Sequence, residues 1–182
     1  MVEFDAGFLS ILFHPNPGIP TEPGTDKPVT DPRKRVEFLI DTLSESREQI
    51  LVPTPALAEI LIALGKAAGP QAVDDLHRES AFRIEAFDER AAIELSHMSE
   101  LKAGEKKRKG QQGTWAKVKF DRQIVAIAKV NGARTIYSTD GDVRKLATRE
   151  GLAVVALHEL PLPPPSTPKL PFGEESNGEP NL

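Results

Sequence analysis

Residues 119–147 read KFDRQIVAIAKVNGARTIYSTDGDVRKLA, and this stretch combines two helical patterns with a strand between them. We interpret Asp121 as the first residue of a helix, because apolar residues recur at helical spacing after it. Asn131-Gly132 is a typical helix stop, and residues 133–138 are typical of a short buried strand. Residues 139–142 then form a turn into a second helix. Carboxylates therefore lie at the start of one helix and just beyond the next strand.

The rest of the chain repeats this alternation of strands and helices. Strands are predicted at residues 2–4, 49–53, 82–87, 133–138 and 151–157, the last apolar enough to be buried on both faces. Helices are predicted at residues 6–13, 32–46, 56–67, 71–79, 89–102, 121–130 and 143–150, with Asp31, Thr54 and Asp88 as N-terminal caps. Alternation of this kind favours an α/β fold, with a parallel sheet covered by helices on both faces.

Composition indicates one domain with two irregular segments. We assign residues 1–158 to the domain, with a proline-rich loop insertion at about residues 14–32, and residues 159–182 to a proline-rich, acidic and disordered tail. The chain has no cysteine, and its four histidines are scattered singly, so thiolate and histidine metal sites are not expected. The N-terminus has no signal-peptide pattern, and no apolar run approaches the roughly 20 residues of a membrane span. We expect a cytoplasmic protein without a membrane partner.

Charge is distributed unevenly along the chain. Residues 102–122 carry a local charge of +6, although the whole chain has a net charge of −4. Such a stretch suits a ligand with a phosphate backbone, and on charge alone a solvated lysine-rich loop explains it equally well. Three of its cations, Lys117, Lys119 and Arg122, lie next to Asp121.

Acidic residues occur at the junctions where the strands of a parallel sheet would meet a ligand. Asp5 follows the first strand, Asp121 precedes the fourth, and Asp140 and Asp142 follow it. Asp121, Asp140 and Asp142 can also be explained by structural roles as helix caps or turn residues. A purely structural role explains Asp5 least well. Glu59 lies opposite the apolar side of its helix, so it faces either water or a cleft.

Convergence of these carboxylates would require a cation, because like charges at one sheet edge repel one another. Carboxylate oxygens are hard ligands that suit Mg²⁺ or Mn²⁺. Such an ion can activate water and stabilise the oxygens of a phosphodiester during its hydrolysis. The acids and the basic stretch together favour a nuclease. A phosphohydrolase with Asp5 as nucleophile is disfavoured, because position 7 is glycine rather than a second acid.

Five segments in their order resemble the PIN-domain family of metal-dependent ribonucleases, in particular VapC-like toxins. They are Phe4-Asp5, residues 54–59 (TPALAE), residues 87–92 (FDERAA), residues 120–128 (FDRQIVAIA) and residues 138–142 (STDGD). The resemblance implies a three-layer α/β/α fold with a five-stranded parallel sheet. It also implies RNA hydrolysis by a metal-activated water, homodimers, and an antitoxin protein whose arginine would enter the acidic site.

Matching positions one by one, the resemblance gives metal-binding and catalytic roles to Asp5, Glu59, Asp121 and Asp140. Asp142 would hold an outer-shell metal water, and Ser138 or Thr139 would hydrogen-bond a carboxylate or a phosphate oxygen. Substrate contacts would come from Ser138, Thr139, Lys117, Lys119 and Arg122. Ala6 departs from the Ser or Thr that commonly follows the first aspartate, so a catalytically silent PIN-like scaffold that binds RNA or protein is the alternative. The long loop and tail likewise leave open a free-standing RNA-processing enzyme.

Overall fold

The sheet has the predicted parallel arrangement. The computed structural model describes residues 1–98 and 112–165, and for residues 112–117 it describes the backbone only. Five parallel strands form one sheet in the order β3-β2-β1-β4-β5. They are β1 (Val2–Phe4), β2 (Ile50–Pro53), β3 (Phe82–Glu85), β4 (Thr135–Tyr137) and β5 (Ala153–Val155). The α/β fold class is therefore confirmed, with β1 at the centre of the sheet.

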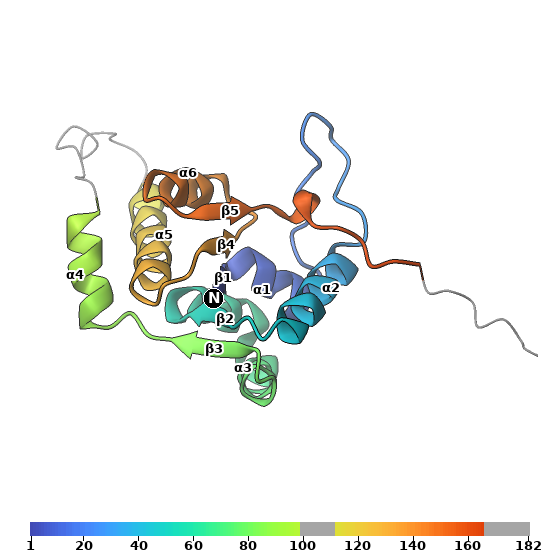
Figure 1. Cartoon of the computed structure of the whole chain (residues 1–182), viewed down its shortest axis with the longest axis horizontal. Coiled ribbons are helices and arrows are strands. Elements are labelled where there is room, and N and C mark those ends of the chain that lie inside the picture. Colours follow the sequence, from blue (N-terminus) through green and yellow to red (C-terminus); the bar gives the residue numbers. More distant parts are fainter. Residues whose placement is uncertain (99–111, 166–182) are drawn as a thin grey trace, which may run out of the picture.

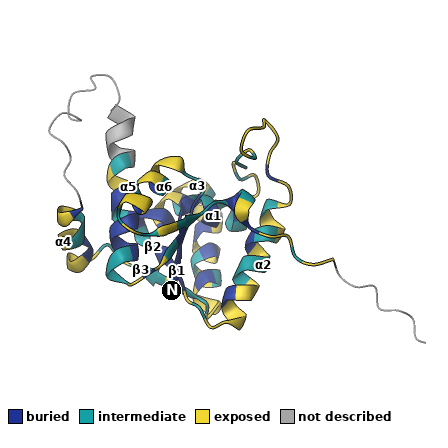
Figure 2. Ribbon diagram, turned by 45° about the horizontal axis from the view of Figure 1, so that its top comes forward, coloured by how far each residue is buried: buried dark blue, intermediate teal, exposed yellow. Residues whose placement is uncertain are grey.

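Helices cover both faces of the sheet and make a three-layer structure (Figure 1). One layer contains α1 (Ala6–Phe13), α2 (Pro32–Glu45) and α3 (Thr54–Arg78), and the other contains α4 (Glu89–His97), α5 (Gln112–Val130) and α6 (Gly141–Arg149). Each layer packs an apolar cluster against its own face of the sheet. The strands β1 and β2 and the inward sides of the helices are buried, whereas the edge strands β3 and β5 are partly exposed, as Figure 2 shows.

The central strand β1 alternates between the two layers. Phe4 packs with Phe8 and Tyr137 in the layer of α1. Glu3 therefore lies on the opposite face, where the strand register pairs it with Leu51 on β2 and Ile136 on β4. All three of these residues are fully buried. Both carboxylate oxygens of Glu3 lack a hydrogen-bond partner within the described residues.

The helix that contains Asp121 begins earlier than we predicted. Asp121 lies inside α5, nine residues after the first residue, Gln112. The expectation that Asp121 opens this helix was wrong, and so was its explanation as an N-terminal cap. The lysines before it are good helix formers that the charge pattern led us to place in a loop. The part of the basic stretch at residues 102–111 lies outside the described residues.

Two other predicted caps differ from the structure, and a third is confirmed. Asp31 precedes α2 but has a left-handed backbone, with φ of 47°, and its side chain makes no capping hydrogen bond. Thr54 is the first residue of α3 rather than its cap, and its hydroxyl accepts a hydrogen bond from the Phe87 backbone N–H. Asp88 caps α4 as predicted, since its carboxylate accepts a hydrogen bond of 2.9 Å from the Ala91 backbone N–H.

Helix α3 replaces the two separate helices that we predicted at residues 56–67 and 71–79, and it breaks at Gly65 rather than between those two ranges. Gly65 has φ of 70° and ψ of −178°, a conformation that is essentially restricted to glycine. Pro70 explains why the break lies upstream, because a proline ring clashes with the carbonyl four residues earlier. By length and mean hydropathy α3 alone among the described helices could cross a membrane. The break divides it into two segments, each shorter than the roughly 20 residues that a span requires.

The C-terminal end of the domain is less buried than expected. Strand β5 was predicted to be buried on both faces, but Ala153 is exposed and Val154 is half-buried. The reason is that β5 is an edge strand with β4 as its neighbour on one side. A short 3₁₀ helix, Leu157–Glu159, follows it, and Leu157 and Leu160 enter the apolar cluster beside α2. Residues 14–31 form the expected irregular loop, with one bridge between Thr21 and Pro28.

Candidate functional site

A cleft of about 440 Å³ lies at the carboxyl ends of β1 and β4. Four carboxylates from separate parts of the chain line it, namely Asp5, Glu59, Asp121 and Asp140. These are the four acids to which the family resemblance assigned catalytic roles. They come from the end of β1, from α3, from α5 and from the start of α6, so the fold brings together residues up to 135 positions apart in sequence.

Asp5 is the most buried of the four acids and is held by three groups. Its Oδ1 accepts a hydrogen bond of 2.9 Å from the Phe8 backbone N–H, which makes Asp5 the N-terminal cap of α1. Its Oδ2 accepts a hydrogen bond from the Ser138 hydroxyl. Burial raises the pKa of Asp5 to about 6, although these hydrogen bonds and one from the Thr139 backbone oppose the rise. The neighbouring Asp140 carboxylate also raises it.

Ser138 connects the ends of the two central strands. Its side chain is buried, donates to Asp5, and accepts a hydrogen bond of 3.0 Å from the Asp140 backbone N–H. Asp140 in turn caps α6, since its Oδ1 accepts a hydrogen bond of 2.7 Å from the Asp142 backbone N–H. The Asp142 side chain is exposed, lies 3.4 Å from Lys145, and does not line the cleft.

Gly7 allows the first turn of α1 to pass directly beside Thr139. A Cβ atom at position 7 would lie 2.0 Å from Thr139 Oγ1 and 3.2 Å from Asp5 Oδ1. Any side chain larger than hydrogen would therefore displace Thr139 or the Asp5 carboxylate. From the sequence, Gly7 served only to disfavour a second acid at that position. A glycine within the first turn of an otherwise apolar helix is the feature that could have indicated this close approach.

Glu59 and Asp121 enter the cleft from helices rather than from strand ends. The sequence left Glu59 between water and a cleft; in the structure it is exposed and lines the cleft. Asp121 is largely buried, with its side chain on the same cleft. Two apolar side chains, Ile62 of α3 and Phe120 of α5, line the same cleft as these two acids. Sequence reasoning did not single out either apolar residue.

The basic residues that we proposed as substrate contacts all belong to α5, but they do not face the same way. Lys119 is exposed on the helix surface. Arg122 is 9% exposed and does not line the cleft. Lys117 lies in the first part of α5, where the structure describes the backbone only. Their role in substrate binding stays a prediction.

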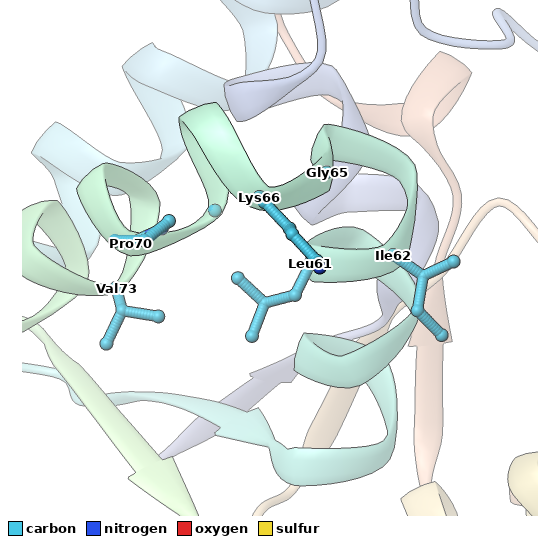
Figure 3. Close-up of a pocket in the computed structure, with 7 residues that line it drawn as sticks. Leu61, Ile62, Gly65, Lys66, Pro70 and Val73 are labelled. Carbon is cyan, nitrogen blue, oxygen red and sulfur yellow. The ribbon is translucent and has the colours of Figure 1, made fainter.

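An apolar groove runs along the outer side of α3 (Figure 3). It occupies about 570 Å³ at the Gly65 break and is lined by Leu61, Ile62, Gly65, Lys66, Gly69, Pro70 and Val73. Ile62 lines both this groove and the acidic cleft. The two hollows therefore adjoin at Ile62.

The donors of the cleft fit a hard divalent cation by their chemistry, because carboxylate oxygens are what Mg²⁺ and Mn²⁺ prefer. Their present spacing does not form a finished binding site. Among the described residues no three His, Asp or Glu side chains are close enough together to hold an ion. Within this set Asp5 is held by Ser138 and by the start of α1, and the neighbouring Asp140 carboxylate raises its pKa.

The fold and the cleft define an α/β protein with a carboxylate-lined cleft at the carboxyl edge of a five-stranded parallel sheet. The chain belongs to the PIN domain family, whose model matches residues 29–149, more than half of its length. This confirms the resemblance seen in the sequence. Glu59, Asp121 and Asp140 lie within the matched range, and Asp5 lies before it.

Solved structures share this fold. VapBC2 from Rickettsia felis, bound to a DNA fragment from their promoter, is 13% identical, with a TM-score of 0.52 over 86% of this chain and 98% of that chain. DNA-bound VapBC from Salmonella typhimurium is 12% identical, with a TM-score of 0.50 over 86% of this chain and 97% of that chain. At these identities the similarity concerns the fold alone. A comparison of the sequence with curated proteins gives no match.

Proposed function

We propose that this protein is a divalent-metal-dependent endoribonuclease. The observation that carries the proposal is the meeting of Asp5, Glu59, Asp121 and Asp140 in one cleft of a PIN-domain fold. A polyanion would be repelled by these acids alone, whereas the sequence around Asp121 is basic, with a charge of +6 over residues 102–122. Carboxylates for a cation, together with a basic flank, suit the hydrolysis of a nucleic-acid phosphodiester.

The cation would be Mg²⁺ or Mn²⁺, and the four carboxylates would hold it. When bound, it supplies the Lewis acidity that activates water and stabilises charge on the phosphodiester oxygens. Asp5 is fixed for this role by Phe8 and Ser138, so one rigid ligand is already in position. Glu59 is exposed on α3, so its side chain would have to turn toward the ion to complete the site. Asp142 lies outside the cleft, so its role would be to hold a water molecule in the outer shell of the metal.

RNA would lie across the open side of the cleft. Thr139 lines the cleft and is a hydrogen-bond donor for a phosphate oxygen, and Lys119 and Lys117 lie on the helix that carries Asp121. The Arg122 guanidinium is mostly buried, so we assign it a weaker contribution. These contacts bind the backbone and position it without reading sequence.

The protein is also proposed to act as the toxin of a toxin–antitoxin pair and to form a homodimer. An antitoxin segment would place an arginine between the carboxylates, where its guanidinium replaces the charge of the metal. Apolar residues of the same segment would fill the groove on α3, since Ile62 belongs to both hollows. Ile62→Asp should then weaken the complex with the product of a neighbouring short reading frame. Sedimentation velocity measures both this complex and the homodimer.

The deciding experiment is cleavage of pooled tRNA and other structured RNA by the full chain in Mn²⁺. Asp121→Asn should abolish cleavage and retain the fold, because an amide keeps the size of the side chain and loses the charge that binds the cation. Asp41→Asn is the matched control, since Asp41 is exposed on α2, away from the cleft. Cleavage that is equal in all three proteins would refute the proposal.

A catalytically silent scaffold is the second candidate, and one observation favours it. The acids among the described residues form no assembled ion site. RNA binding that persists in EDTA, with no cleavage under any divalent metal, would support the scaffold. Calorimetric titration with Mn²⁺ would separate it from an enzyme that lacks its cognate RNA, because the scaffold should not bind the ion.

A further inference from the structure

Two exposed apolar side chains face the acidic cleft. The described residues contain four large hydrophobic side chains that are strongly exposed, namely Ile62, Ile93, Phe120 and Leu162. Ile62 is 82% exposed, Phe120 is 48% exposed, and both line the cleft that holds the four acids. Single exposed apolar residues need no explanation, but two of them at one cleft mark a binding surface.

The position of each residue ties it to one of the acids. Ile62 lies three residues after Glu59 on α3, so the two side chains are neighbours on one face of the helix. Phe120 directly precedes Asp121 on α5, and Ile124 continues the apolar lining one turn further along. The cleft therefore combines four carboxylates with two exposed apolar side chains from different helices, Ile62 and Phe120, which we call the apolar rim.

We propose that Phe120 is a stacking platform for a single unpaired nucleobase next to the scissile phosphate, with Ile62 packing against the same nucleotide. This rests on the proposed function. A phosphate at the carboxylates places the adjoining base a few ångströms away, within reach of the apolar rim. Base–aromatic stacking is a common way to hold single-stranded RNA, whereas paired bases in a duplex are already stacked on one another.

The first test compares aromatic and aliphatic replacements. Phe120→Leu keeps an apolar side chain and removes the π face, and Phe120→Trp keeps the π face. We expect Phe120→Leu and Phe120→Ala to lower kcat/KM for a looped RNA by about five- to 150-fold, and Phe120→Trp to retain activity. Ile93→Ala is the matched control, because Ile93 is 51% exposed on α4 and lies outside the cleft. Equal loss with Leu and Trp, or no loss with Ala, would overturn the proposal.

The second test removes the base instead of the side chain. Once the cleavage site is mapped, an RNA with an abasic nucleotide beside it should be cleaved more slowly by the wild type. Phe120→Ala should not discriminate between the abasic and the normal RNA, because the stacking contact is already absent. If both proteins lose the same factor on the abasic RNA, Phe120 does not contact the base.

The third measurement separates this proposal from the proposed function. Fluorescence anisotropy in EDTA measures binding of a labelled single-stranded RNA without any cleavage. Weaker binding by Phe120→Ala, in a protein that cleaves nothing, would retain the stacking platform and refute the nuclease. Unchanged RNA binding, together with a shift of Phe120→Ala to a smaller species in sedimentation velocity, would overturn the platform and assign Phe120 to a protein interface.

Discussion

Replacing Glu3 by leucine should make the protein more stable. Glu3 lies on the central strand, between Leu51 and Ile136 in the strand register, and all three are fully buried. Neither carboxylate oxygen has a hydrogen-bond partner within the part of the chain that the structure describes. A buried polar group without a partner costs about 1–3 kcal/mol in protein mutational data. Leucine of similar volume would complete an apolar row under α5, so Glu3→Leu should raise the free energy of unfolding by about this amount.

The increase in unfolding free energy caused by Glu3→Leu should become larger as the pH rises. Burial raises the pKa of Glu3 well above its ordinary 4.5, and the Asp5 carboxylate raises it further. A raised folded-state pKa means that the folded protein keeps a proton which the unfolded chain releases, so wild-type stability falls as pH rises above about 4.5. The advantage of Glu3→Leu should therefore widen by up to about 1.4 kcal/mol per pH unit, until the pH reaches the folded-state pKa. Below pH 4.5 the cost of the neutral, unpaired carboxyl remains.

Urea unfolding followed by circular dichroism at pH 4.5 and pH 7.5 measures this difference, with EDTA present so that no cation contributes. Glu3→Gln is the control, because it removes the titration and keeps an unpaired polar group. The stability of Glu3→Gln should lack the pH dependence that Glu3 causes. At low pH this variant should not show the increase in unfolding free energy that Glu3→Leu shows. A Glu3→Leu protein that is less stable than the wild type at pH 7.5, or a stability difference that does not change with pH, would refute the reasoning.

Two further predictions concern the cleft. Gly7→Ala should lower the free energy of unfolding by about 1–3 kcal/mol, because its Cβ would lie 2.0 Å from Thr139 Oγ1. Adding Thr139→Ala should recover part of this loss in urea unfolding. If the effects of the two substitutions are simply additive, the contact is contradicted. Mn²⁺ affinity should fall as pH is lowered from 7 to 5, by up to about tenfold per pH unit below 6. The reason is that the Asp5 pKa of about 6 makes proton release a condition of binding. Calorimetry in two buffers of different ionisation enthalpy counts that proton, and pH-independent affinity would contradict the assignment.

The strands and their parallel arrangement could be predicted, because their signals are local. Glycine and proline mark the ends of most elements, and short apolar runs lie between them. Gly132, with φ of 72°, ends α5 just as Asn131-Gly132 indicated. The rule that ligands meet a parallel sheet at the carboxyl ends of its strands then located Asp5 and Asp140 without any knowledge of contacts. Both residues do line the cleft.

Features that depend on neighbours could not be predicted. The apolar sequence of β5 fits a central strand and an edge strand equally well, and the position in the sheet decides its exposure. The helical wheel of α3 left Glu59 between water and a cleft, because only the packing of α3 against α1 and α5 puts a cleft on that side. The Gly65 break was placed too late in the sequence, since the effect of Pro70 reaches back by one turn.

The structure also shows that one residue at a strand–helix junction can both cap the helix and belong to the functional site. Asp5 and Asp140 each follow a strand and cap the next helix, and each also lines the cleft. The topology imposes this double use, because the carboxyl end of a parallel strand leads directly into the N-terminus of a helix at the same edge of the sheet. Removing either carboxylate would therefore weaken a helix as well as the site, by roughly 0.5–2 kcal/mol for the cap alone.

Asp121 differs from these two acids. It lies in the interior of α5, where backbone N–H groups are already bonded within the helix and no cap is required. An aspartate has poor intrinsic helix propensity at such a position. Its position is explained by the cleft that it lines with the other three acids. Asp121→Asn should therefore separate function from stability more cleanly than a change at Asp5 or Asp140, and this is why the cleavage experiment uses it.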